Sequence, residues 1–187
     1  MAAPRIAPRE PPYPEHIRDM LDAWMGPIDK DPLRIFRTFA VHDQLAPRAG
    51  VLGAGILAHG LLTPSEREVM IQRTCYLCGA EYEWGVHATL LGERGGLGEV
   101  QLDSTVHGSA ADPCWSEREA RAYRLADELH SDATVSDELF ADLHDHFSDE
   151  EILELVVTAG WYRTISYVIN TAQVELEEWA ARFPAAR

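Results

Sequence analysis

The chain has 187 residues, of which 46% are hydrophobic and 25% charged, a composition typical of a globular domain with its own core. Sixteen basic residues against 31 acidic ones give a formal net charge of −15, which repels phosphate backbones and anionic lipids, so neither nucleic-acid nor membrane binding is expected. The single lysine, Lys30, lies in an acidic stretch flanked by prolines, so catalysis through a lysine Schiff base is not expected.

The N-terminal residues 1–14 contain five prolines and favour an extended arm, because proline interrupts a helix. Helical periodicity begins near Glu15, and the Gly26-Pro27 pair should end that helix. A second helix is expected from about Pro32 and a third from Ala46 to His59.

Three capping boxes mark the starts of later helices, because each places a hydroxyl residue three positions before a glutamate. They are Thr63-Pro-Ser-Glu66, Ser116-Glu-Arg-Glu119 and Ser148-Asp-Glu-Glu151. Ser136 should begin one further short helix. No segment alternates apolar and polar residues with β-branched side chains. We therefore expect one all-α domain, residues 15–187, with about eight helices and no sheet.

A glycine-rich segment lies between Gly92 and Asp112. Its Gly95-Gly96-Leu97-Gly98 run is not preceded by a predicted strand, and no Gly-Lys-Ser/Thr follows it, so a phosphate-binding loop is not indicated. We expect a turn that ends a helix.

The cysteines, Cys75, Cys78 and Cys114, are few and odd in number, which favours a reducing compartment over a disulfide framework. Residues 1–9 lack the apolar region of a signal peptide, and the longest mostly apolar run, residues 51–62, is too short to span a bilayer. We therefore expect a cytoplasmic protein.

The most informative segment for chemistry is Glu81-Tyr-Glu-Trp-Gly-Val-His87. Glu83 and His87 are four residues apart, so on a helix a carboxylate can orient the imidazole and raise its pKa, as a general acid or base requires. Glu68 precedes them on the previous helix, and an antiparallel return would bring it to the same place. The alternative is an exposed Glu–His pair that only stabilises its helix slightly.

The run LTPSERE…RTCYLCGAEYEWGVHATLLGERGGL resembles the carboxymuconolactone decarboxylase family, also called alkylhydroperoxidase-D-like, and within it the Tyr-Glu-Trp-x-x-His branch. The segments from Asp31 to Phe36 and from Gly160 to Asn170 resemble the same branch, so the resemblance covers most of residues 14–180. It implies an alkylhydroperoxidase-D-like helical bundle that forms a homo-oligomer, a trimer or hexamer, with active sites near the subunit contacts. The content of Arg and Ala is typical of a GC-rich, bacterial genome.

The peroxidase branch of this family carries Cys-x-x-Cys-x-x-x-His and a glutamate one helix earlier. Counted back from His87, its two cysteine positions fall on Ala80 and Glu83, so the thiols are absent there. Cys75 and Cys78 form a Cys-x-x-Cys pair nearer the N-terminus. They are either small packing residues or, alternatively, a displaced redox pair.

Five further residues are candidates for binding substrate: Arg73, Tyr82, Trp84, Tyr162 and Asn170. Arg73 would bind a substrate carboxylate, although pairing with Glu66 or Glu81 is an equal alternative. Tyr82 and Trp84 are more often core or subunit-interface residues than pocket walls. Tyr162 and Asn170 would line the pocket from the last long helix.

Metal and cofactor chemistry are not expected. His144 and His146 are two residues apart, which on a helix points them about 200° apart, and no short-spaced set of three ligands occurs. Cys114, next to a proline and a tryptophan, is interpreted as a packing residue.

These patterns lead to three hypotheses about function. The first is a cofactor-independent lyase or isomerase that uses His87, Glu83 and Glu68 on a small carboxylate, lactone or enolisable carbonyl compound. In it, His87 transfers the proton, Glu83 orients it and Glu68 is a second relay. The second is a thiol-dependent hydroperoxide reductase through Cys75 and Cys78. The third is a non-catalytic oligomeric binding protein. Trp24, Trp84, Trp161 and Trp179 are expected to supply apolar surface for self-association.

Overall fold

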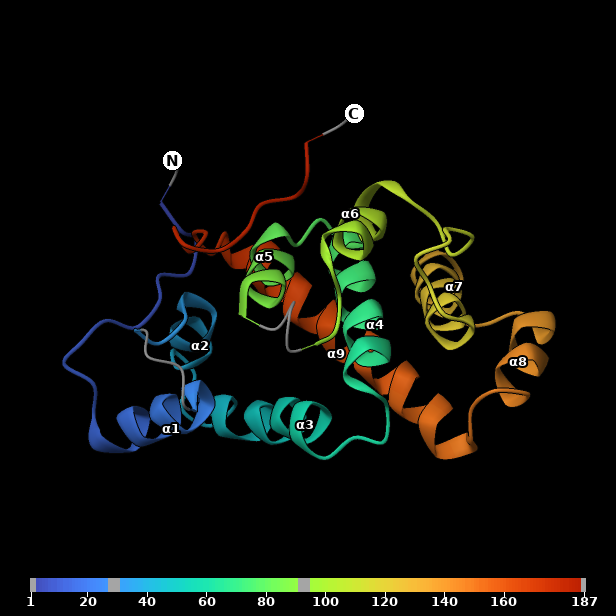
Figure 1. Cartoon of the computed structure of the whole chain (residues 1–187). Helices are drawn as coiled ribbons and strands as arrows, with labels where there is room; N and C mark the ends of the chain where they lie inside the picture. Colours follow the sequence, from blue (N-terminus) through green and yellow to red (C-terminus); the bar gives the residue numbers. More distant parts are fainter. Residues whose placement is uncertain (1–2, 27–30, 91–94, 186–187) are drawn as a thin grey trace. The chain divides into compact units, whose positions relative to one another are not determined.

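A computed structural model of the chain describes residues 3–26, 31–90 and 95–185. These ranges contain nine helices and no strand, which confirms the all-α prediction (Figure 1). The helices are α1 (Glu15–Met25), α2 (Arg34–Phe39), α3 (Ala46–Ala58), α4 (Pro64–Leu77), α5 (Glu81–Leu90), α6 (Glu99–His107), α7 (Glu117–Asp132), α8 (Asp137–His144) and α9 (Asp149–Ala172).

The chain divides into two compact units. The first comprises Met1–Gly60 with Val168–Glu178, and the second comprises Leu61–Tyr167 with Trp179–Arg187. Helix α9 therefore begins in the second unit and ends in the first. The three residues of the predicted acid–base site all belong to the second unit.

In the first unit, the N-terminal arm is extended from residue 3 to residue 14, as its prolines predict. It is held by backbone hydrogen bonds: the Arg5 amide donates to the Ala172 carbonyl at 2.8 Å, and the Arg9 amide donates to the Arg37 carbonyl at 3.0 Å. The arm is thus part of the first unit's structure.

The first helices of this unit form as their periodicity predicts. α1 buries Ile17 and Leu21 against Ala40. It ends at Gly26, whose φ of 55° lies in the left-handed region that glycine adopts without strain. Pro27 and Lys30, both considered in the sequence, lie outside the described residues.

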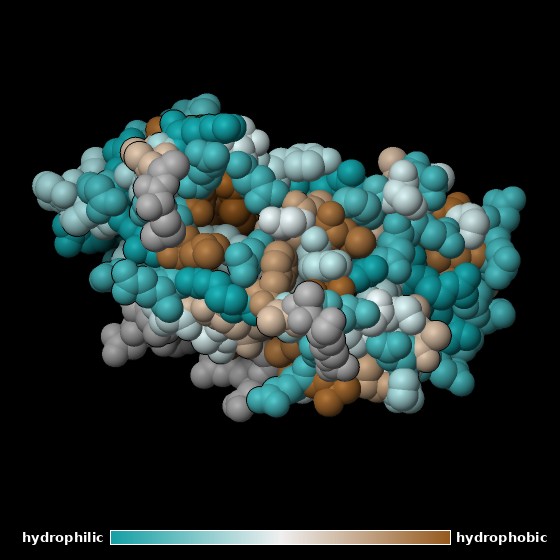
Figure 2. Space-filling model, turned by 90° about the horizontal axis from the view of Figure 1, so that it is seen from above, coloured by the Kyte–Doolittle hydropathy of each residue, from teal (hydrophilic) through white to brown (hydrophobic). Residues whose placement is uncertain are grey.

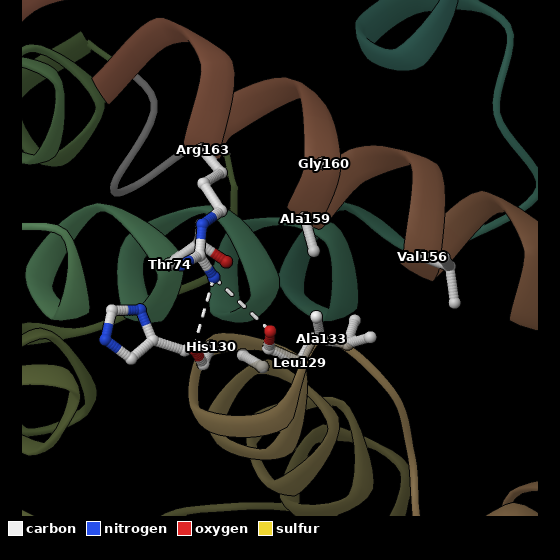
Figure 3. Close-up of a pocket in the computed structure, with 9 residues that line it drawn as sticks. Thr74, Leu129, His130, Ala133, Val156, Ala159, Gly160 and Arg163 are labelled. Atoms are coloured by element: carbon white, nitrogen blue, oxygen red, sulfur yellow. Dashed lines mark hydrogen bonds between the residues drawn. The ribbon is translucent and has the colours of Figure 1, made fainter. Parts of the chain in front are cut away.

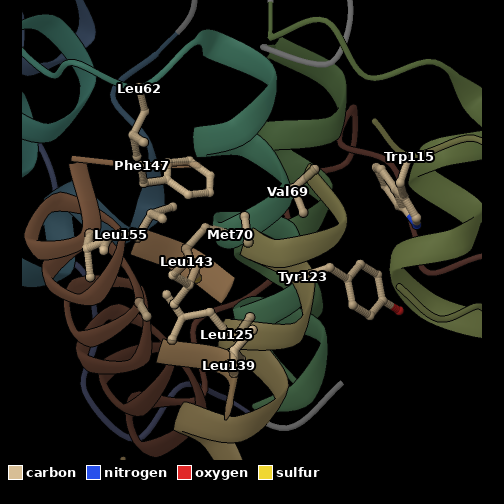
Figure 4. Packing of buried hydrophobic residues seen from close by; sticks show 14 of the residues in the cluster. Leu62, Val69, Met70, Trp115, Tyr123, Leu125, Leu139, Leu143, Phe147 and Leu155 are labelled. Carbon is tan, nitrogen blue, oxygen red and sulfur yellow. The ribbon is translucent and has the colours of Figure 1, made fainter. Parts of the chain in front are cut away.

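The core of the second unit surrounds α4. This helix packs against α5, α6 and α7, and its residues 68–72 are all buried, so it has no face left for solvent. The core cluster is shown in Figure 4, where α4, α7, α8 and α9 contribute; its labelled members are Leu62, Val69, Met70, Trp115, Tyr123, Leu125, Leu139, Leu143, Phe147 and Leu155.

The three predicted capping boxes are confirmed. Thr63 with Glu66 begins α4, and Ser116 with Glu119 begins α7. At α9 the Ser148 amide donates to the Glu151 carboxylate at 2.8 Å, and the Glu151 amide donates to the Ser148 hydroxyl at 3.3 Å. Each box satisfies amides that a helix start leaves unpaired.

The nine helices of the described ranges agree with the expected number of about eight. The helix that was not individually expected is α6, which begins directly after the predicted turn at Gly95-Gly96-Leu97-Gly98. Its N-cap is Gly98, which has no capping side chain; the Gln101 side chain accepts from the Gly98 amide at 3.0 Å instead. The glycines before α6 carry no capping side chain, so the sequence gives no clear signal for the start of this helix. Gly92, in the same segment, lies outside the described residues.

Arg118 on α7 connects three segments of the second unit. It forms ion pairs with Glu66 of α4 and with Glu151 of α9 (2.7 Å), and its guanidinium lies 3.9 Å from the ring centroid of Phe147. Because the Glu66 residue is only 4% exposed, Arg118→Ala leaves a buried carboxylate without its charge partner, although the Thr63 amide still donates to it. We expect a loss of about 2 kcal/mol in the free energy of unfolding, measured by urea denaturation.

Arg124→Ala is the matched control, because this arginine on the same helix contacts Asp142 at 3.4 Å but is 40% exposed, so a change of at most about 1 kcal/mol is expected. Equal losses in the two variants would contradict this account.

Hydrophilic side chains cover most of the face shown in Figure 2, with smaller hydrophobic patches among them. None of the helices in the described ranges is both long and apolar enough to cross a membrane. The exposed large hydrophobic residues include Val51, Leu52 and Leu57 on α3. Of the four tryptophans named above, Trp84 is 3% exposed, whereas Trp24, Trp161 and Trp179 are half-buried, and Trp24 packs edge-on against Phe36.

Candidate active site

The turn between α4 and α5 creates the site. The Gly79 amide donates to the Tyr76 carbonyl and the Ala80 amide to the Cys75 carbonyl, both at 2.8 Å, and Gly79 has a φ of 65°. This pair of bonds with a left-handed glycine is a Schellman motif, which ends α4 and lets α5 begin after only three intervening residues. The turn at Gly79 therefore explains why the chain reverses direction and why α5 runs back alongside α4 toward Glu68.

His87 on α5 lies between two carboxylates. Its Nδ1 is 3.1 Å from Glu68 Oε2, and its Nε2 is 3.5 Å from Glu83 Oε1. The His87 residue is 5% exposed, Glu83 9% and Glu68 0%. The i, i+4 spacing supplies the Glu83 contact, whereas the contact with Glu68 depends on helix packing.

The electrostatics of this trio favour a protonated imidazole. Burial by itself lowers the pKa of His87, but the charges and hydrogen bonds of Glu68 and Glu83 outweigh it and raise this pKa to about 10. At neutral pH His87 is therefore an imidazolium that donates from both nitrogens.

Helix α9 supplies a third side of the cluster. The Tyr162 ring is perpendicular to the imidazole of His87, with ring centroids 5.1 Å apart. Burial, followed by the charges of Glu83 and Glu68, raises the pKa of Tyr162 well above its usual value, and Arg67 opposes this only weakly. The Tyr162 hydroxyl therefore stays protonated and can donate a hydrogen bond.

The cysteine pair lies beside this cluster, at the end of α4. Cys75 is fully buried, and burial, followed by the charge of Glu83, raises the pKa of its thiol well above the usual value. Burial also raises the pKa of Cys78, although the charge of Arg163 opposes this increase. Cys78 and Cys114 are partly buried, and all three cysteines are free thiols.

Several oxygen and nitrogen atoms in the cluster have no hydrogen-bond partner among the described residues: Oε1 of Glu68, Oε2 of Glu83 and both amide atoms of Gln72. Gln72, which is 0% exposed, was missed by the sequence analysis. The sequence feature that could have identified Gln72 is its spacing: it lies four residues after Glu68 and three before Cys75, on the same helix face.

Arg73 is engaged elsewhere. Its Nε donates to Asp127 at 2.6 Å, its Nη1 donates to the Thr105 carbonyl at 2.9 Å, and its guanidinium lies 4.5 Å from the Tyr123 ring centroid. Of the alternatives considered, neither Glu66 nor Glu81 is its partner, because α7 supplies Asp127 across the helix interface.

The other candidates lie in different surroundings. Trp84 is buried, and its Nε1 donates to the Thr105 hydroxyl at 3.0 Å. Tyr82 is 2% exposed, so both aromatic residues of the signature belong to the interior of the second unit. Asn170 is exposed and belongs to the first unit. The structure thus brings Tyr162, Glu68, Glu83 and His87 together.

No group of three His, Cys, Asp or Glu residues in the described part of the chain is arranged to hold a metal ion. His144 instead contacts Asp149 at 3.4 Å, and His146 contacts Glu117 at 3.4 Å.

A separate cavity of about 220 Å³ lies between α4, α7 and α9 (Figure 3). Arg163 donates to the carbonyls of Leu129 and His130 at its edge, and the Cys78 sulfur is 3.9 Å from His130 Nδ1. The remaining lining is mainly apolar; its residues are Thr74, Ala126, Ala133, Val156, Ala159 and Gly160. It therefore lacks the acid–base groups of the His87 cluster.

Comparison with protein-family models and with curated protein sequences found no match. Solved structures match over most of the chain. A peroxidase-related protein from Silicibacter sp. TM1040 is 12% identical and has a TM-score of 0.80, covering 95% of this chain and 96% of that one.

Two further structures are similar. An alkylhydroperoxidase AhpD core protein from Ralstonia eutropha JMP134 is 15% identical, with a TM-score of 0.70 and 95% of each chain covered. A variant of the debrominase Bmp8, in complex with 2,3,4-tribromopyrrole, is 16% identical, with a TM-score of 0.75 and 92% of this chain and 91% of that one covered. The chain therefore has the alkylhydroperoxidase-D-like fold.

Proposed function

We propose that this chain, which has the alkylhydroperoxidase-D-like fold, is a cofactor-independent enzyme that moves a proton next to a carbonyl group, as a lyase or isomerase does. The observation that supports this most is a buried imidazolium held between two carboxylates, each with one oxygen that has no hydrogen-bond partner among the described residues. Such an arrangement supplies a base and an electrostatic stabiliser in one place.

The geometry favours Glu83 as the base. Its side chain is 12% exposed, against 1% for Glu68, and its Oε2 has no partner among the described residues. Glu68 makes the shorter contact with His87 and suits the orienting role. This assignment moves proton transfer from His87, for which the sequence suggested it, to Glu83, and it gives Glu68 the orienting role that the sequence suggested for Glu83.

The reaction follows from these groups. Glu83 takes the proton from the carbon next to the carbonyl, and the electron pair moves onto the carbonyl oxygen. That oxygen accepts a hydrogen bond from the Tyr162 hydroxyl, while the imidazolium of His87 stabilises the developing charge. Return of the proton to the same or another carbon completes an isomerisation.

Exchange of substrate protons with deuterium oxide tests this function. Small lactones and β-keto acids are incubated with the protein in deuterium oxide, and loss of the proton signal next to the carbonyl is followed by NMR. Glu83→Gln is expected to slow exchange by about 100-fold or more, because it removes the base.

Glu99→Gln is the matched control, since Glu99 is an exposed carboxylate at the start of α6 and its variant should exchange at the wild-type rate. Undiminished exchange in Glu83→Gln, or no exchange with any compound of the panel, would contradict the proposal.

Thiol-dependent peroxide reduction is the second candidate, because two of the similar structures are peroxidase-related or AhpD proteins. The raised thiol pKa values of Cys75 and Cys78 argue against it, since the thiolate is the reactive form. Hydroperoxide consumption with a dithiol reductant should therefore be the same in wild type and in the Cys75→Ser/Cys78→Ser variant.

We also propose that the chain forms a homo-oligomer. Val51, Leu52 and Leu57 of α3 are exposed, and the apolar surface that they offer supports self-association.

A further inference from the structure

A buried amide next to the acid–base cluster has no role in the mechanism above. Gln72 is 0% exposed, and neither its Nε2 nor its Oε1 has a hydrogen-bond partner among the residues that the structure describes. Native interiors rarely leave a buried amide wholly unpaired, because each unmet hydrogen bond destabilises the fold. An occupant absent from the protein chain itself is therefore indicated.

The amide lies on the same side of α4 as the cluster. Successive helix residues are rotated by about 100°, which places Gln72 about 40° from Glu68 and about 60° from Cys75. Glu68 contacts His87 directly, so this side of α4 faces α5. Gln72 is thus a neighbour of the two glutamates.

The hydrogen-bonding capacity of the unpaired atoms indicates which ligand groups they can bind. Glu68 Oε1, Glu83 Oε2 and Gln72 Oε1 are acceptors, whereas Gln72 Nε2 is a donor. A ligand group that suits them must donate hydrogen bonds and accept at least one. A hydroxyl group does both, whereas a carboxylate only accepts.

The net charge of the cluster also favours a hydroxyl group over a carboxylate as the ligand. Two carboxylates and one imidazolium leave one net negative charge in the cluster. Arg67 starts about 100° from Glu68 around α4, and its charge acts on Tyr162, so it offsets part of this negative charge. The carboxylates of Glu68 and Glu83 are the charged groups on the side of Gln72, so a carboxylate bound next to Gln72 would meet their repulsion in a poorly solvated place.

We propose that Gln72 binds the substrate and that, with Glu68 and Glu83, it selects a neutral hydroxyl-bearing compound, such as an alcohol or an enol, over a carboxylate. This inference rests on the proposed function and narrows its substrate class, since enols form when carbonyl compounds lose a proton from the neighbouring carbon. Gln72 is a specificity-determining residue in this account, separate from the base.

Trifluoroethanol and trifluoroacetate are suitable probes, because they are similar in size and differ in having a neutral hydroxyl or a carboxylate. Each is titrated into the full-length protein and followed by fluorine NMR of the probe and by the imidazole signals of His87. Trifluoroethanol should bind and shift the His87 signals, and trifluoroacetate should bind at least about tenfold more weakly.

Gln72→Met separates binding from folding, because methionine has a similar length and no amide. We expect trifluoroethanol to bind about tenfold more weakly, and the melting temperature of the free protein to rise by about 2–4 °C, because two unpaired buried polar atoms are removed. Gln44→Met, at an exposed glutamine, is the control and should change neither quantity.

Equal binding of the two probes, or no His87 response to trifluoroethanol, would overturn the inference and leave water as the occupant. A lower melting temperature with unchanged binding in Gln72→Met would also overturn it, since the amide would then have a structural role. The deuterium-exchange test does not depend on Gln72: exchange without hydroxyl selectivity rejects only this inference, and hydroxyl binding without exchange rejects only the proposed reaction.

Discussion

Glu68→Gln is expected to lower the pKa of His87 substantially and to reduce the dependence of stability on pH. Glu68 makes the closest charged contact with His87, at 3.1 Å, and both side chains are nearly inaccessible to water. Glutamine keeps the shape of glutamate but removes the charge that outweighs the effect of burial on the imidazolium.

The direction in which stability changes with pH follows from proton linkage. The folded protein holds the His87 proton up to a pKa of about 10, whereas the usual value is 6.5. The stabilisation is therefore complete below pH 6.5 and is lost as the pH rises toward about 10. In the wild type this loss amounts to at most about 5 kcal/mol of unfolding free energy.

Urea denaturation at several pH values, together with an NMR titration of the His87 ring, measures both effects. The decline in stability between pH 6.5 and 10 should be clearly smaller in Glu68→Gln, and His87→Asn should show a similar reduction. A decline equal to that of the wild type in both variants would show that His87 does not carry the linked proton.

Gly85→Ala is expected to destabilise the second unit by about 1–3 kcal/mol. A Cβ atom at this position would lie 2.0 Å from the Ala181 carbonyl oxygen, a distance at which the backbone must move. The C-terminal segment is held over α5 by the Ala181 amide, which donates to the Thr89 hydroxyl at 2.8 Å. The substitution should displace this segment.

Chemical denaturation gives the global effect, and hydrogen exchange of the Ala181 amide gives the local one, which should become faster. Gly55→Ala is the matched control, because nothing lies within 4 Å of a Cβ there and alanine should stabilise α3 by about 0.5–1 kcal/mol. An unchanged Ala181 exchange rate in Gly85→Ala would contradict the close approach.

The sequence alone determined the features that depend on residues close together in the chain. Capping boxes fixed the starts of α4, α7 and α9, because a hydroxyl and a glutamate three residues later satisfy the same helix end. The spacing of Glu83 and His87 likewise predicted their contact, since four residues make about one helical turn.

The tertiary structure decided which residues meet across helices. Glu68 became the closer partner of His87, Arg73 paired with Asp127, and Tyr162 joined the cluster from α9. Such pairs depend on how helices pack over tens of residues, which local spacing does not encode.

Gln72 illustrates the same limit. Its position on α4 follows from the helical period, but an interior glutamine normally finds a partner, and nothing in the sequence shows that this one has none among the described residues. The sequence therefore determined the helices apart from α6, together with the pairing of Glu83 with His87. Only helix packing decided which buried polar atoms have no partner among the described residues.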